Sequence, residues 1–477
     1  MTHDPSAGAP LDLAGVGIGP ANLSLAALAH PVPGLRTAFH DQRPSFHWHP
    51  GLLIEGTTLQ VPFLADLVTL ADPTSPFSFL SYLAHRQRLY PFYFAERLHP
   101  LRTEYDAYCR WVSGRLPSLR FGHRVEAVRW DAADGLFVLD VTRTGAAPGP
   151  GPDAAGEPRP APCRVRARNV VLGVGTAPHV PEALRGQADD PSVPVVHSSD
   201  YLRHRDRLLA AGHVTVVGSG QSGAEVFLDL LRHRPAGAER LHWLARSPAF
   251  APMEYSKLGL EHFTPDYTRY FHTLPEPVRD ALPGRQWQLY KAVDHQTLAA
   301  VHDELCRRSQ HGGWPDTVLT PGVTVRAAFR TAEGRIGLDL AHAEQGTRAG
   351  LVTDAVVLAT GYRERPLDRL LAPLGDAVRR DSAGRPRIDE YYRLVLDPSV
   401  TGAVFVQNAE RHTHGVGAPD LGLVAHRSAV VLAALTGHPP YPLPERTAFT
   451  AFGLGQQPRA HEETSAARSS EHPRAHS

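Results

Sequence analysis

Residues 11–26 read LDLAGVGIGPANLSLA, an apolar run that enters a glycine-rich turn and continues in a helical pattern. Gly17 and Gly19 allow a tight turn and the close approach of a pyrophosphate, which then rests on the positive N-terminus of the helix. Pro20 follows the turn, and Asn22 stands where a third glycine is common. Asp41 ends the next apolar run about 20 residues later, where an acid binds a ribose hydroxyl. The stretch predicts a dinucleotide-binding unit.

A second unit of the same kind begins at His213 and reads HVTVVGSGQSGAEV. Its turn contains Gly218, Gly220, Gln221 and Ser222. The next apolar run, from Leu241, ends at Arg246 instead of an acid, and an arginine there suits the 2′-phosphate of NADP. Only two of the 49 basic residues are lysines, Lys257 and Lys291. A general preference for arginine is therefore a second explanation of Arg246.

Two such units predict two nucleotides, a bound flavin and a nicotinamide donor. Residues 359–362 read ATGY, which is typical of the connection between the two nucleotide domains of flavin oxidoreductases. We therefore expect an α/β protein with two Rossmann-like dinucleotide-binding domains and a small, mainly helical substrate-binding region. The predicted ranges are 11–195 and 395–455 for the flavin domain, 196–250 and 318–394 for the nicotinamide domain, 251–317 for the helical region, and 1–10 and 456–477 for disordered tails. Residues 145–162 predict the loop of an extended hairpin.

Composition narrows the possible partners. The chain has 477 residues, and its 49 basic and 49 acidic side chains cancel, which removes the electrostatic argument for a nucleic-acid or anionic-membrane partner. Its three cysteines are isolated, without the spacing of a metal site or a dithiol redox centre. No apolar run approaches the ~18 residues that cross a bilayer, and the N-terminus has no signal pattern. We expect a cytoplasmic protein without a metal.

Further stretches point to one family. They are DQRPSFHWHPG (41–51), LQVPFLADL (59–67), DPTSPFSFLSYL (72–83), RTEY (102–105), NAERHTHG (408–415) and LGLVAHRS (421–428). Together with GSGQS (218–222) and ATGY, they resemble the lysine/ornithine N-monooxygenases, the flavin-dependent N-hydroxylating enzymes of siderophore biosynthesis. The resemblance covers nearly the whole folded chain in the right order, and it is closer to the diamine branch than to the amino-acid branch.

The resemblance implies an enzyme that uses FAD, NADPH and O2 and is usually a homo-oligomer, a dimer or a tetramer. NADPH reduces the flavin, O2 forms a C4a-hydroperoxyflavin, and a terminal primary amine attacks its distal oxygen. The amine must be unprotonated to react, although alkylamines have a pKa of about 10.4, so the site must favour the neutral form. Water must be excluded, because it promotes decay to H2O2.

The resemblance also implies roles for individual residues. The implied FAD contacts are Gly17, Gly19, Pro20, Asn22, Asp41, Trp48, His49, Gln60, Leu421 and Leu423. Gln60 is in addition the implied catalytic residue, as a hydrogen-bond partner near the reactive edge of the flavin. The implied NADPH contacts are Gly218, Gly220, Gln221, Ser222 and Arg246. Taken without the resemblance, Trp48 and His49 would be read as a packed loop, and Lys257 and Lys291 as surface lysines.

One position departs from the family pattern and concerns the substrate. Family members that act on lysine or ornithine usually carry a lysine just before the aspartate of LQVPFLADL, and it pairs with the α-carboxylate of the amino acid. Here the pair is Ala65 and Asp66. An unpaired carboxylate in a dry pocket would cost several kcal/mol. Ala65 therefore predicts a substrate without a carboxylate, a linear diamine, with cadaverine favoured over putrescine.

The second ammonium group of a diamine requires an acid or carbonyl partner. Candidates are Asp66, Glu261, Asp266 and Asp294, among which the sequence does not choose. An L-lysine N6- or L-ornithine N5-monooxygenase remains the main alternative, with Lys257 or Arg102 as the partner of the carboxylate. Another flavin/NADPH oxidoreductase and a non-enzymatic flavin-binding module are more distant alternatives.

Overall fold

The first glycine turn lies in a seven-stranded sheet of order β3-β2-β1-β6-β5-β4, in which β17 also pairs with β6. The computed structural model describes residues 9–144, 163–190, 192–310 and 313–454. The strands are β1 (Leu11–Val16), β2 (Thr37–Asp41), β3 (Leu119–Phe121), β4 (His123–Asp131), β5 (Leu136–Arg143), β6 (Cys163–Leu172) and β17 (Val404–Val406). β1 pairs in parallel with β2 and β6, whereas β5 pairs antiparallel with β4 and β6. The predicted hairpin loop between β5 and β6 and the predicted tails, apart from residues 9 and 10, lie outside the described residues.

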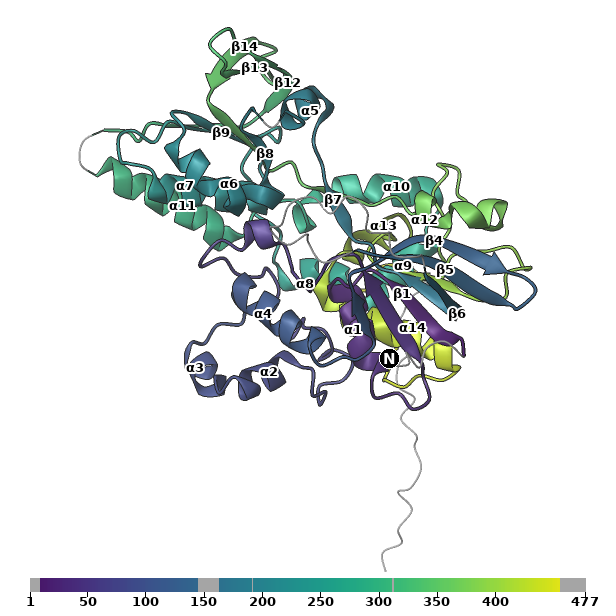
Figure 1. The fold of residues 1–477 in the computed structure, drawn as a ribbon. Helices are drawn as coiled ribbons and strands as arrows, with labels where there is room; N and C mark the ends of the chain where they lie inside the picture. The colour runs from purple at the N-terminus through teal and green to yellow at the C-terminus, as the bar shows by residue number, and fades with distance from the viewer. Residues whose placement is uncertain (1–8, 145–162, 191, 311–312, 455–477) are drawn as a thin grey trace, which may run out of the picture.

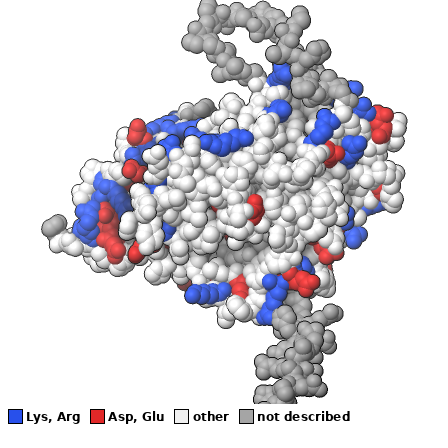
Figure 2. All heavy atoms as spheres, turned by 90° about the horizontal axis from the view of Figure 1, so that it is seen from below, with Lys and Arg blue, Asp and Glu red and all other residues white. Residues whose placement is uncertain are grey.

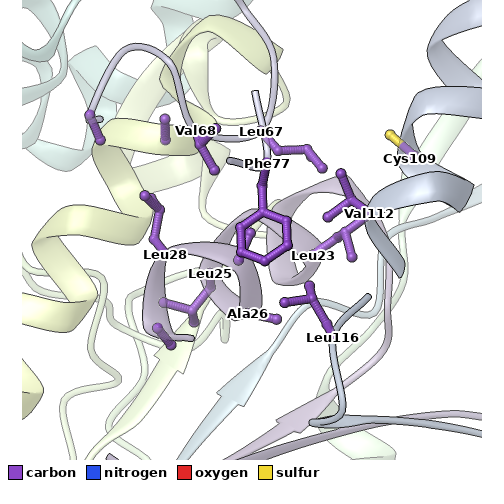
Figure 3. Close-up of a cluster of buried hydrophobic side chains, with 14 of the residues drawn as sticks. Leu23, Leu25, Ala26, Leu28, Leu67, Val68, Phe77, Cys109, Val112 and Leu116 are labelled. Carbon is purple, nitrogen blue, oxygen red and sulfur yellow. The ribbon is translucent and has the colours of Figure 1, made fainter. Parts of the chain in front are cut away.

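Helix α1 (Pro20–Ala29) is buried along most of its length because its sequence is apolar on nearly all sides. It packs against α14 (Val424–Thr436) and α4 (Arg102–Ser113) on one face of the first sheet (Figure 1). Figure 3 shows Leu23 and Leu28 of α1 among side chains of the loop after β2, including Leu67 and Phe77, and of α4. This core fixes the direction in which α1 points its N-terminus.

The second glycine turn lies in a five-stranded, fully parallel sheet of order β11-β10-β9-β15-β8. Its strands are β8 (Val195–His197), β9 (Val214–Val217), β10 (Leu241–Leu244), β11 (Thr317–Thr320) and β15 (Ala355–Leu358). Helices α6 (Tyr201–Ala210), α7 (Gln221–His233) and α11 (His295–Ser309) pack on one face, at the left in Figure 1. The other face carries α5 (Glu182–Ala188) and the antiparallel strands β12 (Val323–Arg330), β13 (Ile336–His342) and β14 (Arg348–Thr353). Two Rossmann-type units are therefore confirmed.

The chain passes between the two sheets through a pair of short antiparallel strands, β7 (Thr176–Pro178) and β16 (Tyr362–Glu364). The predicted boundaries at 195/196 and 394/395 differ from this arrangement. Leu184 of α5 already packs with the second sheet, and the apolar side chains from Leu367 to Leu394 pack against the first. The structure therefore places the crossings near residues 178 and 362. Residues 365–394, in which the chain returns to the first sheet, contain only α12 (Asp368–Leu371), the 3-10 turn Ala372–Ala377 and isolated bridges. Their sequence therefore shows no periodic pattern that would indicate this return.

The region expected to be helical contains α8 (Lys257–Leu260), α9 (Pro265–Thr273), α10 (Glu276–Arg285) and α11. Only part of it stands apart from the sheets, because α11 packs on α7, whereas α9 packs on α13 (Arg411–His414). The remaining elements are α2 (Phe79–His85), α3 (Leu89–Phe94) and the 3-10 turns Pro50–Leu52, Ser198–Asp200, Glu261–Phe263, Trp287–Leu289, Gly415–Gly417 and Leu421–Leu423.

Within the described ranges, no single helix combines the length and the apolar composition needed to cross a membrane. The segments Arg411–Gly417 and Leu421–Thr436 meet that test only when taken together, across a bend of 103°. Most of α14 is buried against the protein's own core.

Candidate active site

Both glycine turns open into one cavity of about 2750 Å³ that is lined by residues of both sheets and of the helical region. Pockets for a single small molecule are typically about 300–1,000 Å³. The cavity is therefore large enough for more than one nucleotide, and it is the site at which the two predicted dinucleotides would meet.

The first turn is shaped to receive a phosphate group. Gly17 has φ +88°, and a Cβ atom there would lie 2.3 Å from the carbonyl oxygen of Gly173, so only glycine fits. Gly19 and Pro20 line the cavity, and within the described ranges no side chain caps the backbone N–H groups at the start of α1. Free N–H groups at a helix N-terminus form an anion site, so these residues fit the pyrophosphate of FAD.

Asn22 lies behind this turn and does not line the cavity, contrary to the expected FAD contact. Its fully buried side chain donates from Nδ2 to the carbonyl oxygens of Val16 (3.1 Å) and Gly17 (2.8 Å). Its Oδ1 accepts a hydrogen bond from Gln407. Asn22 therefore holds the turn in shape from inside the core.

Asp41 lines the cavity at the end of β2, as expected, but its carboxylate is already engaged. It accepts hydrogen bonds from the backbone N–H of Ile18 (2.8 Å) and from the guanidinium of Arg43 (2.8 Å), which forms a salt bridge with it. Burial raises the pKa of Asp41, but the hydrogen bonds and charge of Arg43 outweigh it and bring the pKa below its ordinary value. Asp41 is thus ionised, and it links the first turn to the loop that follows β2.

That loop places Trp48, His49 and Gln60 in the cavity wall. The backbone N–H of Trp48 donates to Asp106 on α4 (2.8 Å), and its ring meets the ring of His49 edge to face at 5.0 Å. His49 also contacts the ring of Tyr362 on β16, 5.7 Å away. Aromatic rings from the loop and from the connecting strand therefore meet where the two domains join.

Gln60 belongs to a polar network that the sequence did not indicate. Its Oε1 accepts a hydrogen bond from Arg102 (3.0 Å) at the start of α4, and Arg102 forms a salt bridge of 2.8 Å with Glu225 on α7. Both charged side chains are largely buried, at 12% and 3% exposure. Burial raises the pKa of Glu225, and the charge of Arg102 opposes this rise. The network ties the loop of the first domain to the helix that begins at the second turn.

Gln221 extends this network toward the helical region. Its Nε2 donates to Glu225 (2.8 Å) and Thr297 (3.0 Å), and its Oε1 accepts from the backbone N–H of Asp294 (2.7 Å). The side chain of Gln221 is therefore used to join α7 to α11, although the residue still lines the cavity. Glu225 follows Gln221 by one helical turn, a spacing that could have marked the pair in the sequence.

The second turn repeats the geometry of the first. Gly218 has φ +125°, and a Cβ atom there would lie 2.2 Å from the carbonyl oxygen of Ala359, the first residue of ATGY. Gly220 and Ser222 line the cavity, and no side chain among the described residues caps the start of α7. Arg246, Lys257 and Lys291 also line the cavity. The cavity that receives the second turn therefore contains cations of the kind that bind the phosphate groups of NADPH.

Three residues predicted to contact the substrate, Ala65, Asp66 and Glu261, lie outside the cavity wall, whereas the candidate Asp294 lines it. Ala65 is buried at 6% exposure, and the neighbouring Asp66 accepts hydrogen bonds from three backbone N–H groups and the hydroxyl of Thr69. Glu261 accepts hydrogen bonds from the backbone of Phe449 and Thr450. These carboxylates therefore organise loops.

The C-terminal segment contributes different residues from those expected. Leu421 lines the cavity, but Leu423 is buried at 4% exposure beneath it, because the 3-10 turn directs the two side chains differently. Asp420 and Tyr255, which the sequence did not single out, line the cavity as well. Asp420 lies just before the LGLVAHRS stretch, and this position was the only signal that could have marked it.

Comparison with known proteins agrees with this geometry. The family model described as L-lysine 6-monooxygenase/L-ornithine 5-monooxygenase matches residues 9–364. The chain is 41% identical to the rhizobactin siderophore biosynthesis protein RhbE of Rhizobium meliloti, over 93% of this chain and 95% of that protein. It is 38% identical to a putrescine N-hydroxylase of Shewanella oneidensis, over 92% and 84%.

Among solved structures, the chain is similar to DfoA bound to FAD, the cadaverine monooxygenase of the desferrioxamine pathway of Erwinia amylovora. The TM-score is 0.85 and the identity 37%, with 94% of this chain and 100% of that chain covered. The predicted family is therefore confirmed, and enzymes of this family use FAD and NADPH. The chain belongs to the L-lysine 6-monooxygenase/L-ornithine 5-monooxygenase family and is a flavin-dependent N-hydroxylating monooxygenase of siderophore biosynthesis.

Proposed function

We propose that this enzyme N-hydroxylates one terminal amine of a linear diamine, with cadaverine preferred to putrescine, in the synthesis of a hydroxamate siderophore. Ala65 is the observation that carries the proposal. Its loop position is fixed on both sides, because its backbone N–H donates to Pro62 (2.9 Å) and Asp66 is held by four hydrogen bonds. Ala65 lies outside the cavity wall, and an alanine on this loop cannot carry a cation into the cavity, as the longer side chain of a lysine would have to do to pair with an amino-acid carboxylate.

The activities of two relatives support the same substrate class. One similar protein is a putrescine N-hydroxylase, and one similar structure is a cadaverine monooxygenase. Lysine as the substrate would require Lys257 or Arg102 to bind its carboxylate. Arg102 is already paired with Glu225 and hydrogen-bonded to Gln60 and Thr58, which weakens this alternative. Lys257 lines the cavity and remains the carboxylate partner that this alternative would require.

The residues of the two turns have distinct roles in this proposal. Gly17, Gly19 and Pro20 bind the FAD pyrophosphate, whereas Gly220, Ser222 and Arg246 bind NADPH. FAD supplies the reduction and activation of O2. Gln60 positions a hydrogen bond at the reacting edge, and its own orientation is held by Arg102. Tyr362 and Trp48 exclude water where the domains meet, which limits the unproductive release of H2O2.

We also propose that the enzyme is a homo-oligomer, a dimer or a tetramer. Large apolar side chains are exposed on and beside α3: Leu89 (43%), Tyr90 (78%), Tyr93 (70%), Phe94 (73%) and Leu98 (60%). Figure 2 views the molecule from below, the side on which α2 and α3 lie in Figure 1, and charged side chains are sparse across the centre of this face. Contiguous exposed apolar surface marks an interface. Light scattering of the FAD-loaded enzyme should give a multiple of the 52.0 kDa chain mass.

Kinetics on four amines test the substrate class. Cadaverine, putrescine, L-lysine and L-ornithine are compared for NADPH oxidation, for H2O2 released and for N-hydroxylated product. The proposal expects the highest kcat/KM and the most product per NADPH with cadaverine, followed by putrescine. Tighter coupling with lysine or ornithine would refute the diamine assignment. Oxidation of NADPH without hydroxylated product from any amine would refute the reaction itself.

A further inference from the structure

A diamine brings a second ammonium group into the cavity, and its partner has not been assigned. This question rests on the proposed function. Three sequence candidates are excluded by their contacts, since Asp66 and Glu261 bind backbone N–H groups away from the cavity wall. Asp266 is bound by Thr447, Ala448 and Arg269. Asp294 lines the cavity, but its Oδ2 caps α11 through Thr297 (3.0 Å).

Asp420 also lines the cavity and also caps a turn, the 3-10 turn Leu421–Leu423, but it does so with one hydrogen bond where Asp294 accepts two. The Oδ1 of Asp420 accepts one hydrogen bond, from the backbone N–H of Gly422 (2.7 Å), and the described residues offer none to Oδ2. No salt bridge joins Asp420 to a cation in the part of the chain that the structure describes. It immediately precedes Leu421, which also lines the cavity. Asp420 therefore presents an unneutralised charge beside the proposed flavin position.

Two cations that act on Asp420 or on Tyr255, Arg427 and Arg102, are already paired with other carboxylates. Arg427 lies beside it but forms a buried salt bridge with Glu410, at 2% and 0% exposure, and donates to the carbonyl oxygen of Ala418. Arg102 is paired with Glu225. The local balance of charge thus leaves room for one additional cation, and a small ammonium ligand would supply it.

The cavity wall brings Asp420 together with Tyr255 and Asp294 of the helical region. Burial raises the pKa of the Tyr255 hydroxyl, and the charges of Asp294 and Asp420 raise it further. The charge of Arg102, which holds Gln60, opposes that rise. Asp420 therefore lies in the wall of the same cavity as Gln60, the residue expected at the reacting edge of the flavin.

We propose that Asp420 binds the ammonium group at the far end of the diamine, opposite to the amine that is hydroxylated. Asp420 is then a specificity-determining residue, and it selects substrates by the charge at their distal end. An ammonium bound to a carboxylate is a charge-assisted hydrogen bond. Binding also removes the cost of an uncompensated carboxylate in the cavity, because the ligand supplies the missing cation.

The test compares two substrates that differ only at the distal end, cadaverine and 5-amino-1-pentanol. In the wild type, cadaverine should have the lower KM, because only cadaverine carries the second ammonium. Asp420→Asn should reduce the preference for cadaverine about 10- to 100-fold, since a hydrogen bond to a charged group contributes about 1.5–3 kcal/mol. The same variant should change kcat/KM for 5-amino-1-pentanol much less than that for cadaverine, because the hydroxyl carries no charge.

Two further variants complete the design. Glu261→Gln is the matched control, because it removes a carboxylate that lies outside the cavity wall, and it should keep the wild-type preference. Asp420→Glu retains the charge and should keep most of the preference for cadaverine. The flavin content of each purified variant, with its activity on 5-amino-1-pentanol, shows whether the site is intact.

Two outcomes would overturn the inference. Equal losses with both substrates would assign Asp420 to the reacting amine, and an unchanged preference would assign the distal ammonium to another residue. The wild-type panel of four amines tests the diamine assignment separately, since it does not involve Asp420. A wild type that prefers lysine would refute the proposed function, whereas loss of discrimination in the variant alone concerns only this residue.

Discussion

Replacing Asp420 with asparagine should make the FAD-loaded, substrate-free enzyme more stable at neutral pH. Burial raises the pKa of Asp420 from its ordinary 3.8 to about 6, although the Gly422 N–H and Arg427 oppose the rise. A shift of about two units corresponds to about 3 kcal/mol, because each unit is worth about 1.36 kcal/mol. Asparagine keeps the acceptor for Gly422 and removes the charge.

The pH dependence follows from the direction of this shift. A carboxyl group with a raised pKa binds its proton more tightly in the folded protein than in the unfolded chain. The wild type therefore loses stability as pH rises from about 4 through 6. The advantage of Asp420→Asn should be about 3 kcal/mol at pH 8, fall to about half of that near pH 5, and vanish below about pH 4.

The assay is thermal or denaturant unfolding of the FAD-loaded wild type and variant at several pH values. Glu261→Gln provides a control of opposite sign, because hydrogen bonds from the segment at residues 449–450 lower the pKa of Glu261, and its charge therefore stabilises the fold. Saturating cadaverine should reduce the difference in unfolding free energy between the two proteins, because it stabilises the wild type more than Asp420→Asn. A variant without added stability, or with a gain that does not change with pH, would refute the reasoning.

Three other substitutions have definite expected outcomes. Gly17→Ala should yield protein with little bound flavin, measured as the ratio of flavin to protein absorbance, because its Cβ would lie 2.3 Å from the oxygen of Gly173; full occupancy would contradict this. Arg102→Met should cost about 3–5 kcal/mol of unfolding free energy by leaving the buried Glu225 without a cationic partner, and a second change, Glu225→Gln, should recover part of it. Arg246→Ala should raise KM for NADPH about 10- to 100-fold with NADH unaffected, and a parallel loss with NADH would exclude contact with the 2′-phosphate.

Local features were predictable from the sequence because their cause is local. Gly17 and Gly218 each combine a positive φ with a neighbouring carbonyl oxygen that would clash with any Cβ atom. Both turns therefore require glycine, and both could be identified from the sequence alone. The family and both cofactors followed from stretches in a fixed order. By contrast, the return of the chain to the first sheet after Tyr362 depends on isolated bridges without a periodic pattern, and the sequence placed it about 30 residues too late.

Side-chain roles that depend on distant partners were not predictable. Asp66 and Glu261 have the residue type expected of an ammonium partner, but backbone N–H groups from other segments occupy their oxygens. Asn22 matches the turn pattern, yet its side chain points into the core toward Gln407. Asp420 is left without a cationic partner because the neighbouring Arg427 is paired with Glu410. Each of these outcomes is set by contacts between segments far apart in the chain.

The paired strands β7 and β16 make the nicotinamide unit an insertion whose two ends meet. The backbone N–H of His179 donates to the carbonyl oxygen of Gly361 (2.9 Å), and the hydroxyl of Thr360 donates to that of His179 (2.5 Å). The chain therefore leaves the flavin unit and returns to it at one place. Residues 179–361 also contain Glu225, which pairs with Arg102, and α9, which packs on α13, so a relative's segment joined at these two positions must keep both contacts to carry its nicotinamide specificity onto the flavin unit.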